Sequence, residues 1–251
     1  MARKVFNSLI AAIALILVTS PVSFSQDKAS GKLKDAANES AKAAEALREI
    51  MNTPDKAIPG DIFDSAQCVA VFPHTIKGGF IIGAQKGDGV VSCRTGKGWS
   101  APVFLDMAGG SIGAQIGGQS TDYVLLFMNR SGVDHLLTNK FSLGGEASVA
   151  AGPVGREAGA STDWKLNAEI LSYSRSKGLF AGVELKGVSI STDRSDMRNV
   201  YGEGVDPKEL LLEGRRTAPE AVQEFPKTLA RYSSRAKDDA GTAEKSARPK
   251  D

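Results

Sequence analysis

The chain has 251 residues, of which 41% are hydrophobic and 24% are charged, so it has enough apolar material for one sizeable globular core. The formal net charge of +2 and the pI near 8.4 exclude a typical nucleic-acid-binding protein, whose pI is usually above about 9. No nucleic-acid partner is expected, and any basic surface must be local.

The N-terminus has the pattern of a secretory signal peptide over residues 1–25. Arg3 and Lys4 precede an apolar run, and Ser23 and Ser25 place small residues at positions minus three and minus one of a cleavage site. A retained membrane anchor is disfavoured because the run is shorter than the roughly 20 apolar residues that a spanning helix needs. We expect an exported protein, periplasmic or secreted after cleavage near Ser25.

The two cysteines, Cys68 and Cys93, would then meet an oxidising compartment, where a disulfide can form. A simple meander of strands over residues 68–72, 78–85 and 89–95 would hold them two strands apart, about 9–10 Å, beyond the roughly 7 Å between Cα atoms that a disulfide spans. The bond requires the first and third strands to be neighbours, so bonded and free cysteines remain open alternatives. A metal site is disfavoured because no further Cys or His ligand accompanies the pair.

Helices are predicted at both ends of the mature chain. Residues 26–54 contain a helix with a thin, alanine-rich apolar stripe, which suits packing along a domain better than insertion into a membrane. Residues 203–234 contain further helices, two of them started by Pro207 and Pro219. Residues 235–251 carry scattered charge without an apolar period and are expected to be disordered.

Between these helices, apolar residues alternate with a period of two, which indicates β-strands. About nine strands with short connections are predicted, and Lys86–Gly89 is predicted to be a hairpin turn between two of them. The lack of alternating long helices excludes a doubly wound α/β fold. The predicted fold class is α+β: an antiparallel, strongly curved β-sheet or partly open β-barrel flanked by N-terminal and C-terminal helices.

The clearest local pattern is a hairpin over Ile170–Ile190, whose two arms alternate around a turn at Ser176, Lys177 and Gly178. After Gly187 the apolar phase moves from odd to even positions, which predicts a β-bulge near that residue. Arg175 and Lys177 lie at the tip beside hydroxyl groups, a combination suited to an anionic head group.

One motif raises the question of catalysis. Gly109–Gly113 matches the G-x-S-x-G pattern around Ser111, and Asp122 and His135 follow in the order of an α/β-hydrolase triad. A nucleophile elbow turns a strand into a helix, whereas Ser111 precedes what looks like another strand, so a serine hydrolase is a minor alternative. No Walker sequence or dinucleotide fingerprint is present. We expect no enzymatic activity, no cofactor and no metal.

Several stretches together resemble the SYLF domain family, whose members include yeast endocytic actin-bundling proteins and many exported bacterial proteins. They are CVAVFP at 68–73, KGGFIIGAQKGDGVVSCR at 77–94, WSAP at 99–102, GGSIGAQIGGQSTD at 109–122, AAGPVGR at 150–156 and SYSRSKGLFAGVELKG at 172–187. The resemblance covers residues 55–202. It implies a β-rich domain that binds anionic phospholipids, phosphoinositides in the eukaryotic members, without enzymatic activity.

The sequence thus predicts a lipid-binding protein of a bacterial cell envelope that docks on anionic, phosphoinositide-like head groups at the membrane surface. The candidate lipid-binding residues are cations at strand ends or turns of these stretches: Lys77, Arg94, Lys97, Arg156, Arg175 and Lys177. Each would contribute on the order of 1 kcal/mol. The alternative is an envelope structural or stress protein that binds another protein. Actin binding is not expected in this compartment, and the oligomeric state is left open.

Overall fold

A computed structural model describes residues 23–53, 57–79, 82–112, 119–155, 168–214 and 216–233. Its strands are β1 (Cys68–Gly79), β2 (Ile82–Thr95), β3 (Gly98–Trp99), β4 (Val103–Ile112), β5 (Gln119–Phe127), β6 (Lys140–Ser142), β7 (Val149–Ala151), β8 (Ile170–Ser176), β9 (Leu179–Gly182) and β10 (Val188–Thr192). They form one ten-stranded sheet in the order β6-β10-β4-β2-β1-β5-β8-β7, with β3 beside β2 and β9 beside β8.

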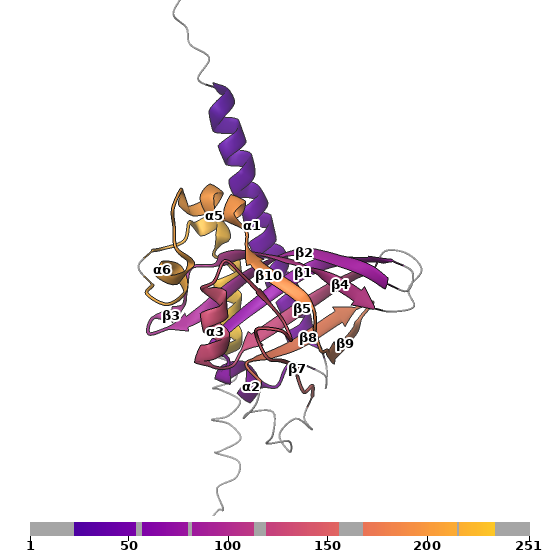
Figure 1. Ribbon diagram of the computed structural model, residues 1–251. Coiled ribbons are helices and arrows are strands. Elements are labelled where there is room, and N and C mark those ends of the chain that lie inside the picture. The colour runs from indigo at the N-terminus through magenta and orange to yellow at the C-terminus, as the bar shows by residue number, and fades with distance from the viewer. Residues whose placement is uncertain are drawn as a thin grey trace, which may run out of the picture.

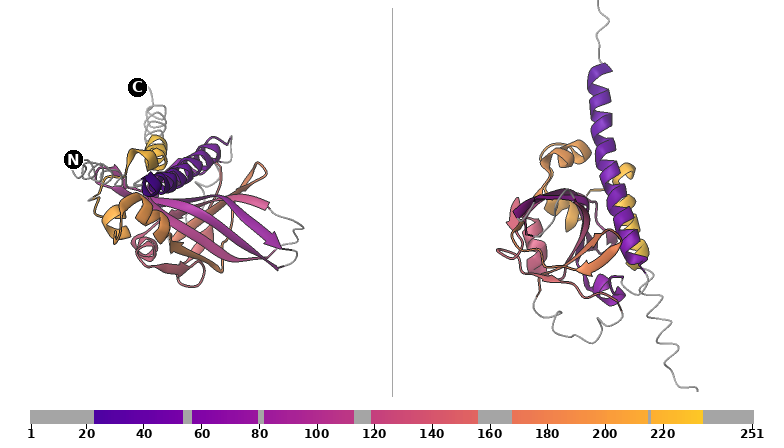
Figure 2. Two further views of the ribbon diagram at one scale, coloured as in Figure 1. Left: turned by 90° about the horizontal axis from the view of Figure 1, so that it is seen from above. Right: turned by 90° about the vertical axis from the view of Figure 1, so that its right-hand side faces the viewer.

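The sheet curls strongly, and seen from the side in Figure 2 it forms an open ring with a long helix on its outside. The predicted α+β class with a curved sheet and flanking helices is therefore confirmed (Figure 1). The long strands pair antiparallel, but β7 pairs with β8 in parallel. The parallel pair arises because the chain returns to β8 by a connection longer than a hairpin turn.

The helices are α1 (Ser23–Met51), α2 (Gly60–Ser65), α3 (Arg130–Leu136), α5 (Arg194–Tyr201), α6 (Pro207–Leu211), the short 3-10 helix η2 (Glu220–Val222) and a last helix over residues 224–233. In Figure 1, α1 runs along the outside of the sheet and its first part extends beyond it. Because α1 begins at Ser23, it continues across the predicted cleavage position, and cleavage near Ser25 stays a prediction.

The apolar stripe of α1 anchors the helix to the rest of the molecule. Leu47 and Ile50 are fully buried in the core, as are several alanines of the same helix. The Ser40 hydroxyl donates to the Val222 carbonyl at 2.7 Å and accepts from the Phe225 amide at 3.2 Å, so it ties α1 to the C-terminal helices. The stripe is thus used for packing within the domain.

β1 and β2 form one long hairpin in place of the predicted three-strand meander. Lys86–Gly89 lies inside β2 and pairs with β4, so the predicted turn at this place is wrong. The connection between the two strands falls at residues 80 and 81, outside the described residues. Cys68 therefore lies directly opposite Cys93, and the two form a disulfide.

The predicted turn of the β8–β9 hairpin is confirmed, but the predicted bulge near Gly187 is wrong. Lys177 and Gly178 have φ angles of 50° and 77°, as a two-residue hairpin turn requires. β9 ends at Gly182, and β10 pairs with β4 and β6 instead of β8. The shift of apolar phase separates two strands in different parts of the sheet, and Gly187 makes the turn between them with φ 74°.

Candidate functional site

The register of the sheet decides which residues share each of its two ends. At one end Cys68 pairs with Cys93 and Phe127, and at the other Lys77 pairs with Gln85 and Gln119. β8 is aligned so that Ser176 and the β8–β9 turn lie at the second end. We call this second end the hairpin end, defined by Lys77, Gln119 and the turn at Lys177–Gly178.

The inner face of the curled sheet is identified by a contact across its interior. The Phe127 ring on β5 lies 6.5 Å from the Phe141 ring on β6, although these strands are not neighbours in the sheet. Odd-numbered side chains of β5 therefore point inward, because side chains alternate between the faces of a strand. Directly paired residues share a face, so Lys77 also belongs to the inner face.

On this inner face Lys77 lies among neutral polar groups. Its Nζ lies 5.0 Å from the centroid of the Tyr123 ring, and burial lowers the pKa of the half-buried ammonium. The Tyr123 hydroxyl donates to Gln85 Oε1 at 3.2 Å, and Gln119 Nε2 donates to the hydroxyl of Ser176. Within the described part of the chain, Lys77 forms no ion pair.

Arg175 also lies at the hairpin end, but on the outer face and with its charge neutralised. Its guanidinium donates to Asp122 Oδ2 from Nε at 3.1 Å and from Nη2 at 2.7 Å, and it also pairs with Glu49 of α1. The other Asp122 oxygen accepts from the His74 amide at 2.8 Å. This arrangement holds α1 and β8 against β1, so Arg175 is a structural residue.

Arg94 has a structural role too, at the opposite end of the sheet. Its Nε donates to the Ala66 carbonyl at 2.9 Å, its Nη2 pairs with Asp64 at 3.2 Å, and its guanidinium lies 4.5 Å from the Trp99 ring centroid. These contacts satisfy carbonyls at the end of α2 and fix α2 to β2. Its donors are engaged within the protein, which leaves few for a ligand.

The remaining predicted cations are distributed over the molecule. Lys177 is exposed at the hairpin end, whereas Lys97 is exposed in the turn between β2 and β3, at the other end. Arg156 lies outside the described residues. The structure thus brings together Lys77, Arg175 and Lys177 and separates Arg94 and Lys97 from them.

Two apolar residues of the hairpin end were missed by the sequence analysis. Ile76 is 66% exposed and Leu179 is 75% exposed, and they are the large hydrophobic side chains that stand out to solvent in the described part of the chain. Ile76 precedes Lys77 on β1, and Leu179 follows the β8–β9 turn. Alternation placed Leu179 in a strand, whereas Ile76 fell between two predicted strands, and the pattern could not show that the sheet continues beyond the core at these positions.

The hydrolase motif does not assemble into a triad. Ser111 is paired with Gly83 near the hairpin end, about 30 Å along the strands from the end where Phe127 lies. His135 is at that far end, where its ring stacks on Phe141 at 5.5 Å. Asp122 is occupied by Arg175, so the three residues do not form a catalytic group.

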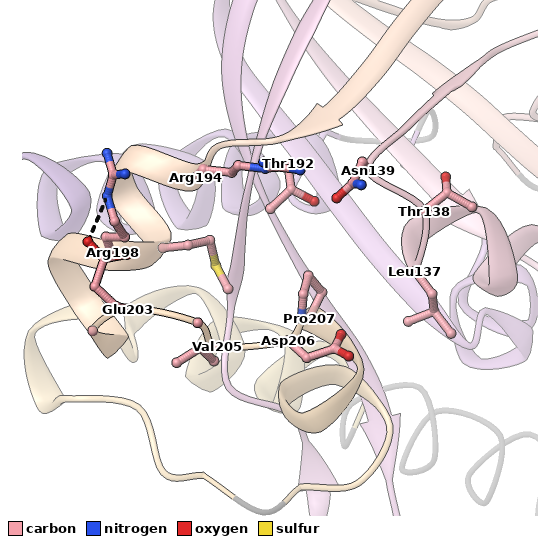
Figure 3. A pocket seen from close by; sticks show the side chains of 13 residues that line it. Leu137, Thr138, Asn139, Thr192, Arg194, Arg198, Glu203, Val205, Asp206 and Pro207 are labelled. Carbon is pink, nitrogen blue, oxygen red and sulfur yellow. Dashed lines mark ion pairs between the residues drawn. The ribbon is translucent and has the colours of Figure 1, made fainter.

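A cavity of about 500 Å³ lies away from the hairpin end, between α5 and the segments before β6 and α6 (Figure 3). Its walls mix apolar Leu137 and Val205 with charges of both signs, and Arg198 pairs with Glu203 at 3.7 Å. Among the described residues no group of His, Cys, Asp and Glu could hold a metal ion, so the cavity offers no metal-ligand set.

None of the described helices has the length and the apolar character of a membrane-spanning segment.

Comparison with known proteins identifies relatives of this chain. A family model described as "Las17-binding protein actin regulator", named Ysc84, matches residues 108–232. LAS seventeen-binding protein 3 of Saccharomyces cerevisiae is 38% identical over 172 residues, which is 67% of this chain and 37% of the yeast protein. The chain belongs to the Ysc84, or SYLF, family.

Animal proteins named as YSC84-like are also similar to this chain. SH3 domain-containing YSC84-like protein 1 of Homo sapiens is 33% identical over 182 residues, 70% of this chain and 53% of the human protein. The relative from Bos taurus is 30% identical over 205 residues, 79% of this chain and 60% of the bovine protein. The chain therefore spans between about a third and two thirds of these relatives, which are named for binding and for SH3 domains and not for an enzymatic reaction.

Proposed function

We propose that this Ysc84-family chain is a non-enzymatic lipid-binding protein of a bacterial cell envelope, exported and then periplasmic or secreted. It docks reversibly by its hairpin end on membranes that contain anionic phospholipid. The observation that carries the proposal is the combination of exposed Ile76 and Leu179 with two lysines, Lys77 and Lys177, that pair with no carboxylate in the described ranges. Apolar side chains beside cations suit the boundary between acyl chains and phosphates.

The expected binding free energies are those of reversible docking on a membrane. Burying a side chain such as Ile76 or Leu179 in the acyl region stabilises by about 1.5–3 kcal/mol, and each lysine near the surface contributes about 1 kcal/mol. Together they reach about 5–8 kcal/mol, which corresponds to dissociation constants from about 200 μM down to about 1 μM. Because part of this energy is electrostatic, salt should weaken the association.

The names of the relatives point to actin regulation and to binding of LAS seventeen, and both properties belong to those proteins. The predicted leader would carry this chain to a compartment without cytoskeletal actin. The proposal therefore takes from the family the lipid-binding property alone.

Co-sedimentation with vesicles tests the proposal. The wild-type chain is expected to bind phosphatidylcholine vesicles that contain phosphatidylglycerol and to bind pure phosphatidylcholine weakly. Leu179→Ser should lower the affinity about tenfold, because it removes roughly 1.5 kcal/mol of apolar burial. Lys177→Asn should lower it about fivefold, and asparagine tolerates the φ of 50° at this turn.

The matched control is Lys97→Asn, which removes another exposed lysine at the opposite end of the sheet and should leave binding unchanged. Equal sedimentation with both kinds of vesicle, or loss of binding in the control as large as in Lys177→Asn, would contradict the proposal. A protein partner that is retained at high salt and lost in Leu179→Ser, without vesicle binding, would favour the protein-binding alternative.

A further inference from the structure

Lys77 is a cation in a place where an anion would stabilise it. Its ammonium is half-buried on the inner face, at 5.0 Å from the Tyr123 ring centroid, and burial lowers its pKa. The ring stabilises the ammonium less than a charge-assisted hydrogen bond does in a partly buried site. Within the described residues no carboxylate pairs with it.

A second group beside Lys77 lacks a partner. Thr121 is 3% exposed, and its hydroxyl has no hydrogen-bond partner within the described structure. It lies between Gln119, which pairs with Lys77, and Tyr123, which the Lys77 ammonium approaches, so it borders the path of the lysine side chain. A buried hydroxyl without a partner destabilises the folded protein. A buried donor next to an unpaired cation is the combination that a bound anion would satisfy.

The other polar groups around Lys77 in the described part of this face are neutral, and two of them are partly exposed at the hairpin end. Gln119 and Ser176 are half-buried, whereas Gln85 is buried, so polar groups continue from the rim inward. Among the described residues of β1, β2, β5 and β8, Lys77 is the cation on the inner face, since Arg175 points outward to Asp122 and Glu49. One positive charge with neutral donors matches a singly charged ligand better than a multiply charged one.

We infer that the inner face of the hairpin end binds the phosphodiester of a glycerophospholipid head group, with Lys77 supplying the cation and Thr121 and Gln119 supplying neutral hydrogen bonds. This inference rests on the proposed function and deepens it. The head group enters the rim of the curled sheet while Ile76 and Leu179 contact the surrounding lipid. The preferred ligand carries one negative charge, as in phosphatidylglycerol, and not the several charges of a phosphorylated inositol.

A soluble lipid separates head-group binding from docking on a membrane. We expect saturable binding of dihexanoyl phosphatidylglycerol, below its micelle concentration, to the full chain in calorimetry. Lys77→Met keeps the aliphatic stem and removes the charge, so binding should fall at least tenfold. Lys97→Met, which removes an exposed lysine at the opposite end of the sheet, should bind the soluble lipid as the wild type does. An NMR titration of the lysine side chains should show the pKa of Lys77 rising when the lipid is bound.

The Thr121→Val variant separates a loss of lipid binding from a loss of folding stability. The valine has nearly the same shape and removes a hydroxyl that lacks a partner, so thermal stability should be unchanged or higher while lipid binding falls several-fold. A dihexanoyl phosphatidylinositol bisphosphate that binds much more tightly than phosphatidylglycerol would overturn the proposed charge preference. Vesicle docking without soluble-lipid binding would overturn the inference and leave the proposed function standing, and failure of both would remove the proposed function itself.

Discussion

At the scale of single residues, the partners of a cation decide what it can do. Arg94 and Arg175 resemble Lys77 and Lys177 in sequence context, since all four lie near strand ends of family-like stretches. The structure gives the two arginines carboxylates and carbonyls, and it leaves the two lysines without an anion in the described ranges. Planar guanidinium groups are well suited to such bidentate internal contacts, whereas an ammonium is not.

Gly182 is a residue at which close backbone approach can be tested. A Cβ built at this position would overlap the carbonyl oxygen of Gly152, a backbone atom that cannot swing aside. Gly182→Ala should therefore lower the stability by about 2 kcal/mol, within the range for overpacked sites. Thermal unfolding measures the change. Gly110→Ala, whose Cβ would meet nothing within 4 Å, is the control and should be nearly neutral; equal losses would contradict the close approach.

At the scale of elements, α1 is held against the sheet across an acidic contact. Glu39 of α1 lies near Asp88 of β2, Asp196 of α5 and Asp193, the N-cap of α5, and Lys42 of the same helix partly offsets these charges. Burial, followed by these carboxylates, raises the pKa of Glu39 to about 8. The helix is also held by Arg48, which pairs with Glu224 at 2.9 Å.

This arrangement predicts a stability that falls as the pH rises. Between the ordinary glutamate pKa of 4.5 and about 8, the folded state holds a proton on Glu39 that the unfolded state has lost. The free energy of unfolding therefore falls as the pH rises through this range. Because Glu39 is partly exposed, we expect a change of about 1 kcal/mol, or roughly 2–4 °C in Tm, between pH 5 and pH 8. Glu39→Gln should be the more stable protein at pH 8 and should lose most of this dependence. If the Tm of the wild type and that of Glu39→Gln changed with pH in the same way, the prediction would be contradicted.

At the scale of the whole molecule, the β1–β2 hairpin forms the centre of the sheet. β1 is paired with β2 on one side and β5 on the other, and β2 continues the sheet to β4. The hairpin carries the disulfide at one end and Lys77 at the other, so a single element links the covalent crosslink to the proposed binding site.

Loss of the disulfide should destabilise the molecule without changing its ligand preference. Cys68 and Cys93 are separated by 25 residues, and crosslinking a loop of this size stabilises by about 3 kcal/mol in the chain-entropy model. The Cys68→Ala/Cys93→Ala variant should therefore unfold about 6–12 °C lower. Thermal melts with and without reductant provide the measurement. The wild type should approach the variant in reductant, and a reductant effect on the variant itself would point to another cause.

The sequence by itself determined the class of the fold and its family, because two-residue periodicity and the order of the family-like stretches are local properties of the chain. It also located the turn at Lys177–Gly178, since that backbone geometry depends on the residues of the turn. Only the tertiary structure decided that Cys68 faces Cys93, that Arg175 is neutralised by Asp122, and that Lys77 points inward beside Thr121. These facts depend on strand pairing and on the face that each strand presents, which residues distant in sequence settle together.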